Sequence, residues 1–127
     1  MTVTARAAVP SPDTKQGRFT AGQLHRIRRM LQAQQAARTA QLRRIERGDV
    51  GGANPLHPAE THSLVESVRK AVADIDFALQ QIFNGRYGIC RGCEQPIALP
   101  RLEALPATSL CLPCQRRHER RERAAMS

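Results

Sequence analysis

The feature that most constrains this chain is a set of four cysteines in two Cys-x-x-Cys pairs. Cys90 pairs with Cys93 and Cys111 with Cys114, 17 residues lie between the pairs, and the chain has no further cysteine. Four thiolates at this spacing can surround one Zn²⁺ as a tetrahedron, with Zn–S distances of about 2.3 Å. Because protein ligands fill all four positions, none stays open to water or substrate. The pattern predicts one structural zinc ion and not a catalytic one.

Disulfides and a redox-active pair are the alternative uses of these cysteines. Residues 1–11 lack an apolar stretch as long as that of a secretory signal, and no stretch is apolar enough to span a membrane. We therefore expect a cytoplasmic protein, in which stable disulfides are rare. A thioredoxin-type couple needs a βαβ context, which is not readable here. Residues 85–115 are too few to fold by apolar burial alone, so zinc is expected to supply on the order of 10 kcal/mol of their folding free energy.

A long helix is predicted upstream of the cysteines. Thr20 followed by Gln23 has the pattern of a capping box, and the helix is expected to run from residue 21 to residue 47, with Gly48 as its C-cap. Apolar residues recur along it at helical spacing. They are Leu24, Ile27, Leu31, Leu42 and Ile45.

A second long helix is predicted after a break. Residues 49–58 hold two glycines and two prolines, which forbid a continuous helix. The next helix is expected to begin near Pro58, or at the capping box of Ser63 and Glu66, and to end near Asn84. Its apolar residues, three and four positions apart, are Leu64, Val68, Val72, Ile75, Leu79 and Ile82.

The two helical stretches carry opposite charge. Residues 21–47 contain seven arginines and one glutamate, a net +6, whereas residues 58–83 contain four acids and two bases, a net −2. We expect an antiparallel hairpin about 35–40 Å long, which forms a projecting prong. The predicted fold is mainly α: an antiparallel two-helix coiled-coil prong, a small four-cysteine zinc finger and a C-terminal helix.

Three regions are expected along the chain. Residues 1–19 are interpreted as a flexible N-terminal tail, and residues 20–83 as the hairpin, with its tip at about 48–58. Residues 84–127 hold the zinc finger and a third helix that begins at Pro113. This last helix carries five arginines and two glutamates up to residue 123. It is either a solvated, salt-bridged helix end or a docking or phosphate-binding surface.

The region around the cysteines contains a further set of residues that recur in one known family. They are Arg86, Tyr87, Gly88, Ile89, Pro96, Ile97, Arg101, Leu102, Glu103, Ala104 and Pro106. With these residues and its cysteines, the region resembles the DksA/TraR zinc-finger family. The resemblance covers about residues 78–117, and the upstream hairpin matches in architecture. It implies a bacterial transcription factor that binds RNA polymerase directly rather than promoter DNA.

The resemblance also implies how such a protein sits on the polymerase. In that family the zinc region and C-terminal helix lie at the rim of the secondary channel, and the coiled coil enters the channel towards the active site. A monomer suffices for this arrangement, and direct DNA binding is not expected. The candidate docking residues are Arg91, Arg101, Arg116, Arg117, Arg120 and Arg121.

The predicted tip departs from the family pattern. The best-known members carry Asp-x-x-Asp-x-Ala there, and the matching positions are Asn54, His57 and Ala59, so only the alanine is kept. Asparagine carries no charge, and histidine is neutral or cationic near pH 7. Asp49 lies close by in the wrong register, and His57 is interpreted as an exposed loop histidine. The sequence predicts an atypical tip without paired acids.

A second departure concerns the alarmone guanosine tetraphosphate. Members of the family that respond to it use basic residues in the region that faces the rim. The matching positions are Asp74, Leu105 and Gln115, none of which is basic. Because a polyphosphate needs cations around it, weak or absent alarmone synergy is expected.

Two other functions stay open. The net charge of +9 is compatible with a basic zinc-finger nucleic-acid-binding protein whose affinity falls steeply with salt, although there is little aromatic surface to stack on bases. A thiolate beside Arg91 is compatible with a redox sensor that releases zinc on oxidation. There is no glycine-rich phosphate loop and no His-Glu metal motif, so no enzymatic activity is expected.

Overall fold

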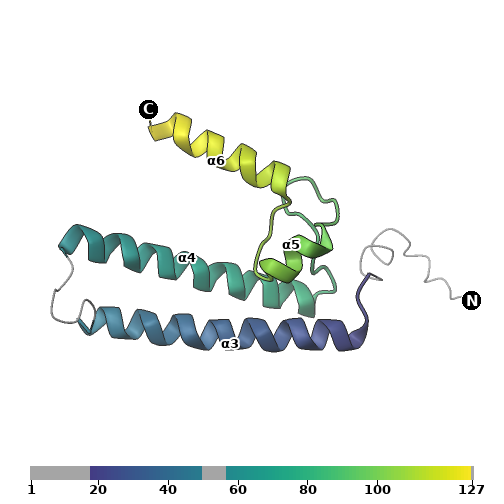
Figure 1. Ribbon diagram of the computed structural model, residues 1–127, viewed down its shortest axis with the longest axis horizontal. Coiled ribbons are helices and arrows are strands. Elements are labelled where there is room, and N and C mark those ends of the chain that lie inside the picture. The colour runs from purple at the N-terminus through teal and green to yellow at the C-terminus, as the bar shows by residue number, and fades with distance from the viewer. Residues whose placement is uncertain (1–17, 50–56, 127) are drawn as a thin grey trace, which may run out of the picture.

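The computed structural model describes residues 18–49 and 57–126, and these ranges are mainly helical. Figure 1 shows two long helices running antiparallel and side by side, with a short helix against their base and a fourth helix extending from the base. The described helices are α3 (Ala21–Glu46), α4 (Pro58–Phe83), α5 (Leu99–Ala104) and α6 (Leu112–Met126). This confirms the predicted fold class of a helical hairpin, a four-cysteine region and a C-terminal helix.

Local motifs set both ends of α3. The Thr20 hydroxyl accepts a hydrogen bond from the Gln23 amide at 3.0 Å, and the Gln23 side chain accepts one from the Thr20 amide at 2.7 Å. The predicted capping box is confirmed. At the other end Gly48 has φ of 82°, which only glycine adopts readily. This turn allows the Asp49 amide to reach the Arg44 carbonyl at 2.8 Å and satisfy a terminal carbonyl of the helix.

The start of α4 corrects two predictions. His57 is the N-cap: its ring nitrogen Nδ1 accepts a hydrogen bond from the Ala59 amide at 3.2 Å. Glu60 completes a capping box by accepting from the His57 amide at 2.8 Å. The helix therefore begins at Pro58, and the alternative start at Ser63 and Glu66 is wrong. His57 is exposed, as expected, but it stabilises the first turn of α4 rather than being an ordinary loop residue.

The seam between α3 and α4 is apolar, and charge contributes little to it. Ile45 and Val68 are buried towards the tip. Arg69 of α4 and Glu46 of α3 form an ion pair between the helices at 3.3 Å. The acid lies on the helix with net positive charge and the arginine on the helix with net negative charge, so the pair is the reverse of what the net charges suggest. Both side chains are about half exposed, so the pair is worth roughly 1 kcal/mol or less.

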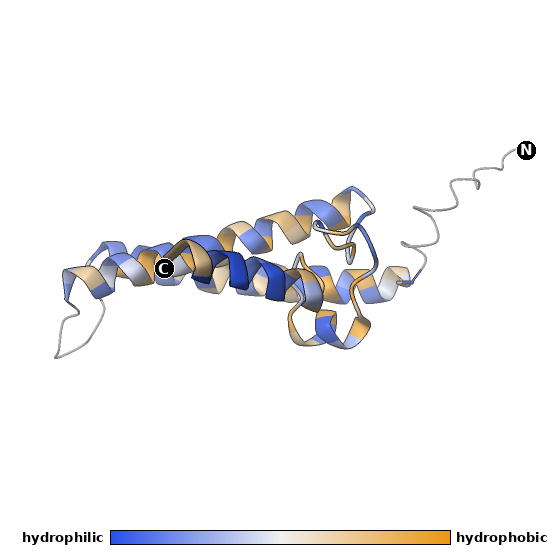
Figure 2. Ribbon diagram, turned by 90° about the horizontal axis from the view of Figure 1, so that it is seen from above, coloured by the Kyte–Doolittle hydropathy of each residue, from blue (hydrophilic) through white to orange (hydrophobic). Residues whose placement is uncertain are grey.

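The main core lies where the hairpin meets the cysteine region. Side chains from both long helices, from the cysteine turns and from α5 share one buried cluster. Figure 2 shows hydrophobic residues distributed along α3 and α4 and a largely hydrophilic α6, which agrees with α6 leaving the core. The buried cluster consists of Leu31, Ile75, Ala78, Tyr87, Cys90, Ile97, Leu102 and Cys114.

The last two residues of the predicted tail belong to this core region. Arg18 donates hydrogen bonds to the Ile97 carbonyl at 2.8 Å and to the Gly88 carbonyl at 3.3 Å. The Phe19 ring lies 5.5 Å from the Tyr87 ring, centroid to centroid. Residues 18 and 19 therefore pack on the base of the hairpin, whereas residues 1–17 of the predicted tail lie outside the described part of the chain. Within the described ranges, no helix has the length and apolar character needed to cross a membrane.

Candidate metal centre

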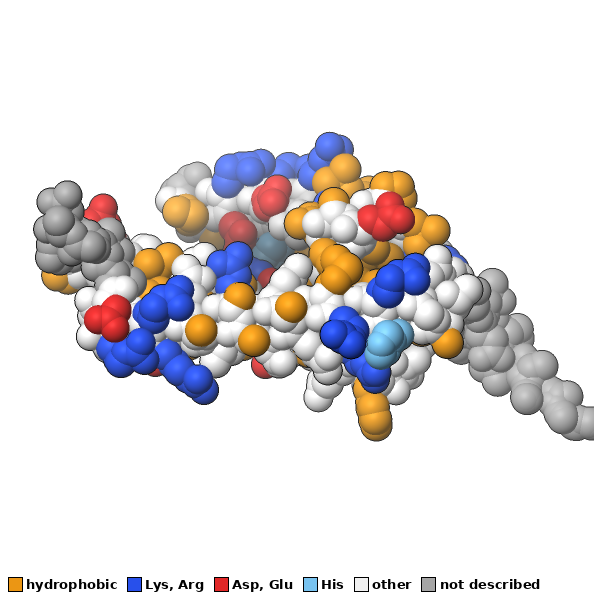
Figure 3. Space-filling view, turned by 60° about the horizontal axis from the view of Figure 1, so that its bottom comes forward, with side chains coloured by type: hydrophobic (Ala, Val, Ile, Leu, Met, Phe, Trp, Pro, Cys, Tyr) orange, Lys and Arg blue, Asp and Glu red, His pale blue; other side chains and the backbone are white. Residues whose placement is uncertain are grey.

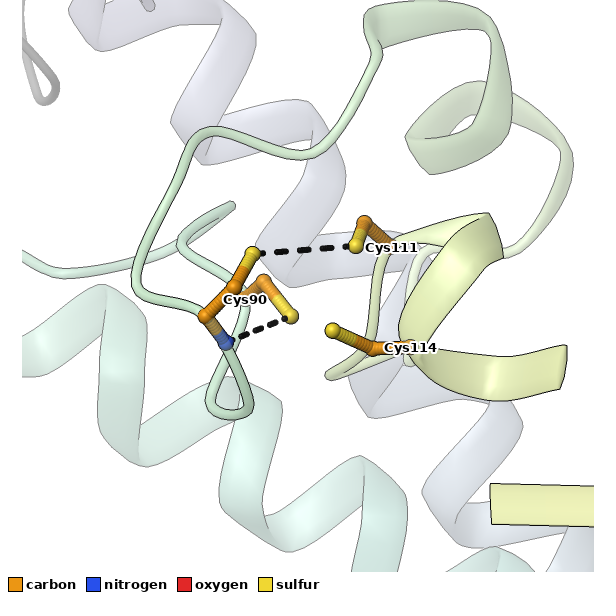
Figure 4. A group of neighbouring side chains, drawn as sticks. Cys90, Cys111 and Cys114 are labelled. Atoms are coloured by element: carbon orange, nitrogen blue, oxygen red, sulfur yellow. Dashed lines mark hydrogen bonds between the residues drawn. The ribbon is translucent and has the colours of Figure 1, made fainter. Parts of the chain in front are cut away.

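The four cysteines converge at the base of the hairpin. Their sulfur atoms all lie within 4.8 Å of one another, and the sulfurs of Cys93 and Cys111 are 3.8 Å apart. A tetrahedron with Zn–S bonds of about 2.3 Å has edges of about 3.8 Å, so this spacing fits one zinc ion. Figure 4 shows the labelled side chains of Cys90, Cys111 and Cys114 pointing towards a common centre. Cys90 and Cys114 are buried, and Cys93 is exposed.

The first cysteine pair sits in a tight turn held by backbone hydrogen bonds. An isolated antiparallel bridge joins Ile89 and Pro96, and the Cys90 amide donates to the Gln95 carbonyl at 2.9 Å. This turn directs two amides, those of Gly92 and Cys93, at the Cys90 sulfur from 3.3 and 3.5 Å. N–H groups aimed at a sulfur favour its thiolate form, which is the form that binds zinc.

The second pair is positioned by the start of α6. Cys114 lies in the first turn of this helix, where unpaired amides give the helix end a partial positive charge that favours a thiolate. A Cβ atom at Gly92 would lie 3.1 Å from the Cys114 sulfur, closer than ordinary contact. The glycine between the first two cysteines therefore allows the two pairs to approach each other.

Without a metal ion, the pKa values of the two buried cysteines are shifted in opposite directions. The pKa of Cys90 is lowered to about 6: burial, the largest single influence, raises it, but hydrogen bonds from the surrounding backbone and from Cys114 together outweigh burial. The pKa of Cys114 is raised to about 12, first by its interaction with the Cys111 sulfur and then by burial. A divalent cation removes this conflict, because it stabilises all four thiolates at once. The donor set fits one structural zinc ion.

Three of the predicted docking arginines make internal contacts at or next to the metal centre. The Arg91 guanidinium lies 4.4 Å from the centre of the Phe77 ring, which joins the first cysteine turn to α4. Arg101 donates to the Leu110 carbonyl at 3.0 Å and so braces the segment before the second pair. Arg116, Arg120 and Arg121 are exposed on α6. Arg117 donates to the Cys114 sulfur at 2.9 Å, a contact that was not foreseen.

The described residues of the predicted tip lie together, far from the metal centre. The end of α3 and the start of α4 occupy the same end of the hairpin in Figure 1. Asp49 follows α3 and pairs with Arg47 at 3.3 Å in an exposed position. His57 and Ala59 are exposed at the start of α4. Asn54 lies outside the described residues.

The three positions aligned with alarmone contacts line one cleft. Asp74, Leu105 and Gln115 face a space of about 840 Å³ between the hairpin and the region from α5 to α6. Sequence reasoning did not foresee that the same cleft also gathers basic side chains from other positions. Lys70 is paired with Asp74 at 2.9 Å. The basic residues that line the cleft are Arg38, Lys70, Arg101 and Arg116.

The fold and the site define a C4-type zinc-finger protein with a helical hairpin, and comparisons with known proteins show what its zinc-finger region is similar to. The profile described as the prokaryotic dksA/traR C4-type zinc finger matches residues 85–120. Over 55 residues, 43% of this chain and 39% of the relative, the sequence is 47% identical to the RNA polymerase-binding transcription factor DksA of Caulobacter vibrioides. It is also 47% identical over 47 residues, 37% of this chain, to an uncharacterized protein of Aquifex aeolicus, of which it covers 32%.

The structural comparison agrees with this fold. The solved structure of the RNA polymerase binding protein and transcriptional regulator Dks from Chlamydia trachomatis is similar with a TM-score of 0.58, over 80% of this chain and 93% of that one. At 22% identity this likeness supports the fold alone. The match to the Caulobacter relative spans about two fifths of that protein's length. Residues 85–120 of this chain therefore match the zinc finger of the DksA/TraR family.

Proposed function

We propose that this protein is a bacterial transcription regulator that binds RNA polymerase at the secondary channel. The hairpin would enter the channel, and the zinc region with α6 would dock at the rim. The observation that carries the proposal is the combination of a family zinc finger with a slender hairpin that extends past the end of α6 (Figure 1). Similar curated proteins are named RNA polymerase-binding transcription factors.

The dimensions of the hairpin support this role. Each long helix has 26 residues and is therefore about 39 Å long. The base is widened by the zinc region, whereas the tip end is only two helices thick (Figure 1). A narrow rod on a broad base suits insertion into a channel up to a fixed depth. The protein would act in the cytoplasm as a monomer and carry out no chemistry of its own.

The proposed tip would act without a pair of carboxylates. Asp49 is already paired with Arg47, and His57 uses its ring nitrogen to cap α4. Substitutions that restore the acids, Asn54→Asp with His57→Asp, offer a direct test. Aspartate is also a good N-cap, so the second change preserves the start of α4. If the missing acids set the effect on transcription, the double variant will differ from the unmodified protein in initiation assays while binding polymerase equally well.

The proposal includes weak or absent alarmone synergy. Of the three aligned positions in the cleft, Asp74 is acidic and neutralises Lys70, which leaves less positive charge for a polyphosphate. Titration of guanosine tetraphosphate into the complex with polymerase tests this. Little change in the affinity of the complex is expected. Strong binding of the alarmone that depends on Asp74 would overturn this part of the proposal.

The primary test is co-elution of the zinc-loaded protein with core RNA polymerase from its own bacterium. Stoichiometric binding is expected, and a competitor known to occupy the secondary channel should displace the protein. A matched variant with residues 49–58 replaced by a short glycine linker should still bind through the base but lose its effect on transcription. Failure to bind polymerase would contradict the proposal.

Nucleic-acid binding is the second candidate function, favoured by the exposed arginines of α3 and α6. On the face drawn in Figure 3, however, Lys and Arg side chains form separate groups with uncharged surface between them. A continuous basic track along the phosphate backbone is therefore not evident on this face. Retention on plain DNA that falls steeply with salt, without polymerase binding, would select this alternative.

A further inference from the structure

The metal centre has a charged neighbour outside the four cysteines. Arg117 lies one turn after Cys114 on α6, and its Nη2 atom is 2.9 Å from the Cys114 sulfur. Residues three apart on a helix share a face, so the contact forms within α6 itself. The sulfur is almost fully buried, at 6% exposure for the residue, whereas the arginine is exposed. An exposed arginine of α6 therefore contacts a buried metal ligand.

The charge of the filled site makes this contact favourable. Four thiolates and one Zn²⁺ carry a net charge of −2, which the surroundings must offset. At Cys90 the offset comes from two backbone amides. At Cys114 it comes from the start of α6 and from Arg117. A hydrogen bond from a charged donor to an anion is roughly twice as strong as one between neutral groups. The two buried sulfurs are thus stabilised in different ways.

Arg91, which directly follows Cys90 in the sequence, points its guanidinium at an aromatic ring. It stacks on the ring of Phe77. Arg117 was grouped with the α6 arginines as a docking residue, yet the structure directs its guanidinium to the metal ligand. We infer that Arg117 is a second-sphere positioning residue that holds the Cys114 thiolate in place and slows the loss of zinc.

The inference predicts a change in zinc retention that is independent of polymerase. In the full-length, zinc-loaded protein, Arg117→Gln should release zinc to an excess of chromogenic chelator about tenfold faster, because lost second-sphere contacts typically weaken metal binding 10- to 100-fold and this one is partly exposed. Arg121→Gln removes the same charge one turn further along α6 and is the matched control. It should stay within about twofold of the unmodified protein. Arg117→Lys keeps the charge and should fall between the two.

A spectroscopic measurement separates this role from a purely structural one. In the cobalt-substituted protein, the thiolate-to-metal charge-transfer band reports on the sulfurs and should shift in Arg117→Gln but not in Arg121→Gln. Helix content from circular dichroism should be equal in both variants. Equal zinc release from the two glutamine variants together with an unshifted band would overturn the inference. If Arg117→Gln does not fold, Arg117→Lys takes its place. The inference would then be overturned if this variant released zinc at the same rate as the unmodified protein and had the same cobalt spectrum.

Discussion

The base and the tip of the hairpin are made of the same two helices but are stabilised in different ways. At the base, Leu31 and Ile75 belong to a core that also contains Cys90 and Cys114. Towards the tip, Ile45 and Val68 are buried in the seam of the helix pair. The metal centre therefore anchors the base of the hairpin, whereas the tip end depends on the apolar seam between α3 and α4 and on the caps of these helices.

The largest expected effect is that of removing the metal. Zinc binding to a small structural site is worth on the order of 10 kcal/mol, so chelation or Cys90→Ser should unfold residues 85–115 and expose the base of the hairpin. Hydrogen exchange followed by mass spectrometry should show the loss of protection there, with a smaller change near Val68. Unchanged protection of residues 85–115 in protein proven free of zinc would show that the metal does not stabilise the base of the hairpin.

The second effect contrasts core positions at the two ends. Leu31 is fully buried at the base, and Leu42 is half-buried towards the tip. Leu31→Ala should lower the free energy of unfolding by about 2–5 kcal/mol, because it leaves a cavity in a closed core. Leu42→Ala should cost clearly less, because water can reach the site. Urea unfolding in saturating zinc measures both, and equal losses would mean that the two ends are packed alike.

The third prediction uses the only tyrosine of the chain. Burial raises the pKa of Tyr87 to about 12, partly offset by the nearby charge of Arg18, and its hydroxyl donates to the Pro106 carbonyl at 2.8 Å. Because the folded state favours the neutral phenol, this contribution of about 2–3 kcal/mol is fully present below pH 10 and is lost as the pH rises to 12. Ultraviolet titration should show ionisation near pH 12, coupled to unfolding of the base. Ionisation near pH 10 in the folded protein would contradict it.

The smallest expected effect lies at the tip. His57→Ala removes the side-chain cap of α4 and should cost about 1 kcal/mol, seen as faster hydrogen exchange at the first amides of α4. His57→Asn restores an acceptor and is the matched control, which should behave like the unmodified protein. The base should be unaffected by either change. Slowed or unchanged exchange in the alanine variant would show that the cap observed here does not hold the helix start.

Features that depend on residues close together in the sequence were predicted better than features that depend on contacts between distant residues. The cysteine spacing and the capping box of Thr20 were readable because each motif is complete within a few residues. The cap at His57 was missed because histidine is an unusual N-cap, although Glu60 three residues later was a usable signal. The packing of Arg18 was not readable, since its hydrogen bonds reach residues 70 and 79 positions away.

The contact between Arg117 and Cys114 could have been predicted from the sequence but was not. An arginine three residues after a metal ligand on a predicted helix is placed to contact that ligand. The run of arginines on α6 hid this relation, because Arg117 was grouped with Arg116, Arg120 and Arg121 as a candidate docking residue. The cleft that gathers Asp74, Leu105 and Gln115 could not be derived, since it depends on the angle at which α6 leaves the base.

The most direct test of the proposed function is site-specific crosslinking to RNA polymerase. A photo-crosslinking residue at Ala59 reports on the tip, and one at Arg121 reports on α6. The account predicts that the Ala59 probe crosslinks to polymerase segments inside the secondary channel near the active site and the Arg121 probe to segments at its rim. Crosslinks from Ala59 to the outer surface or to DNA, in a complex that still forms, would contradict it.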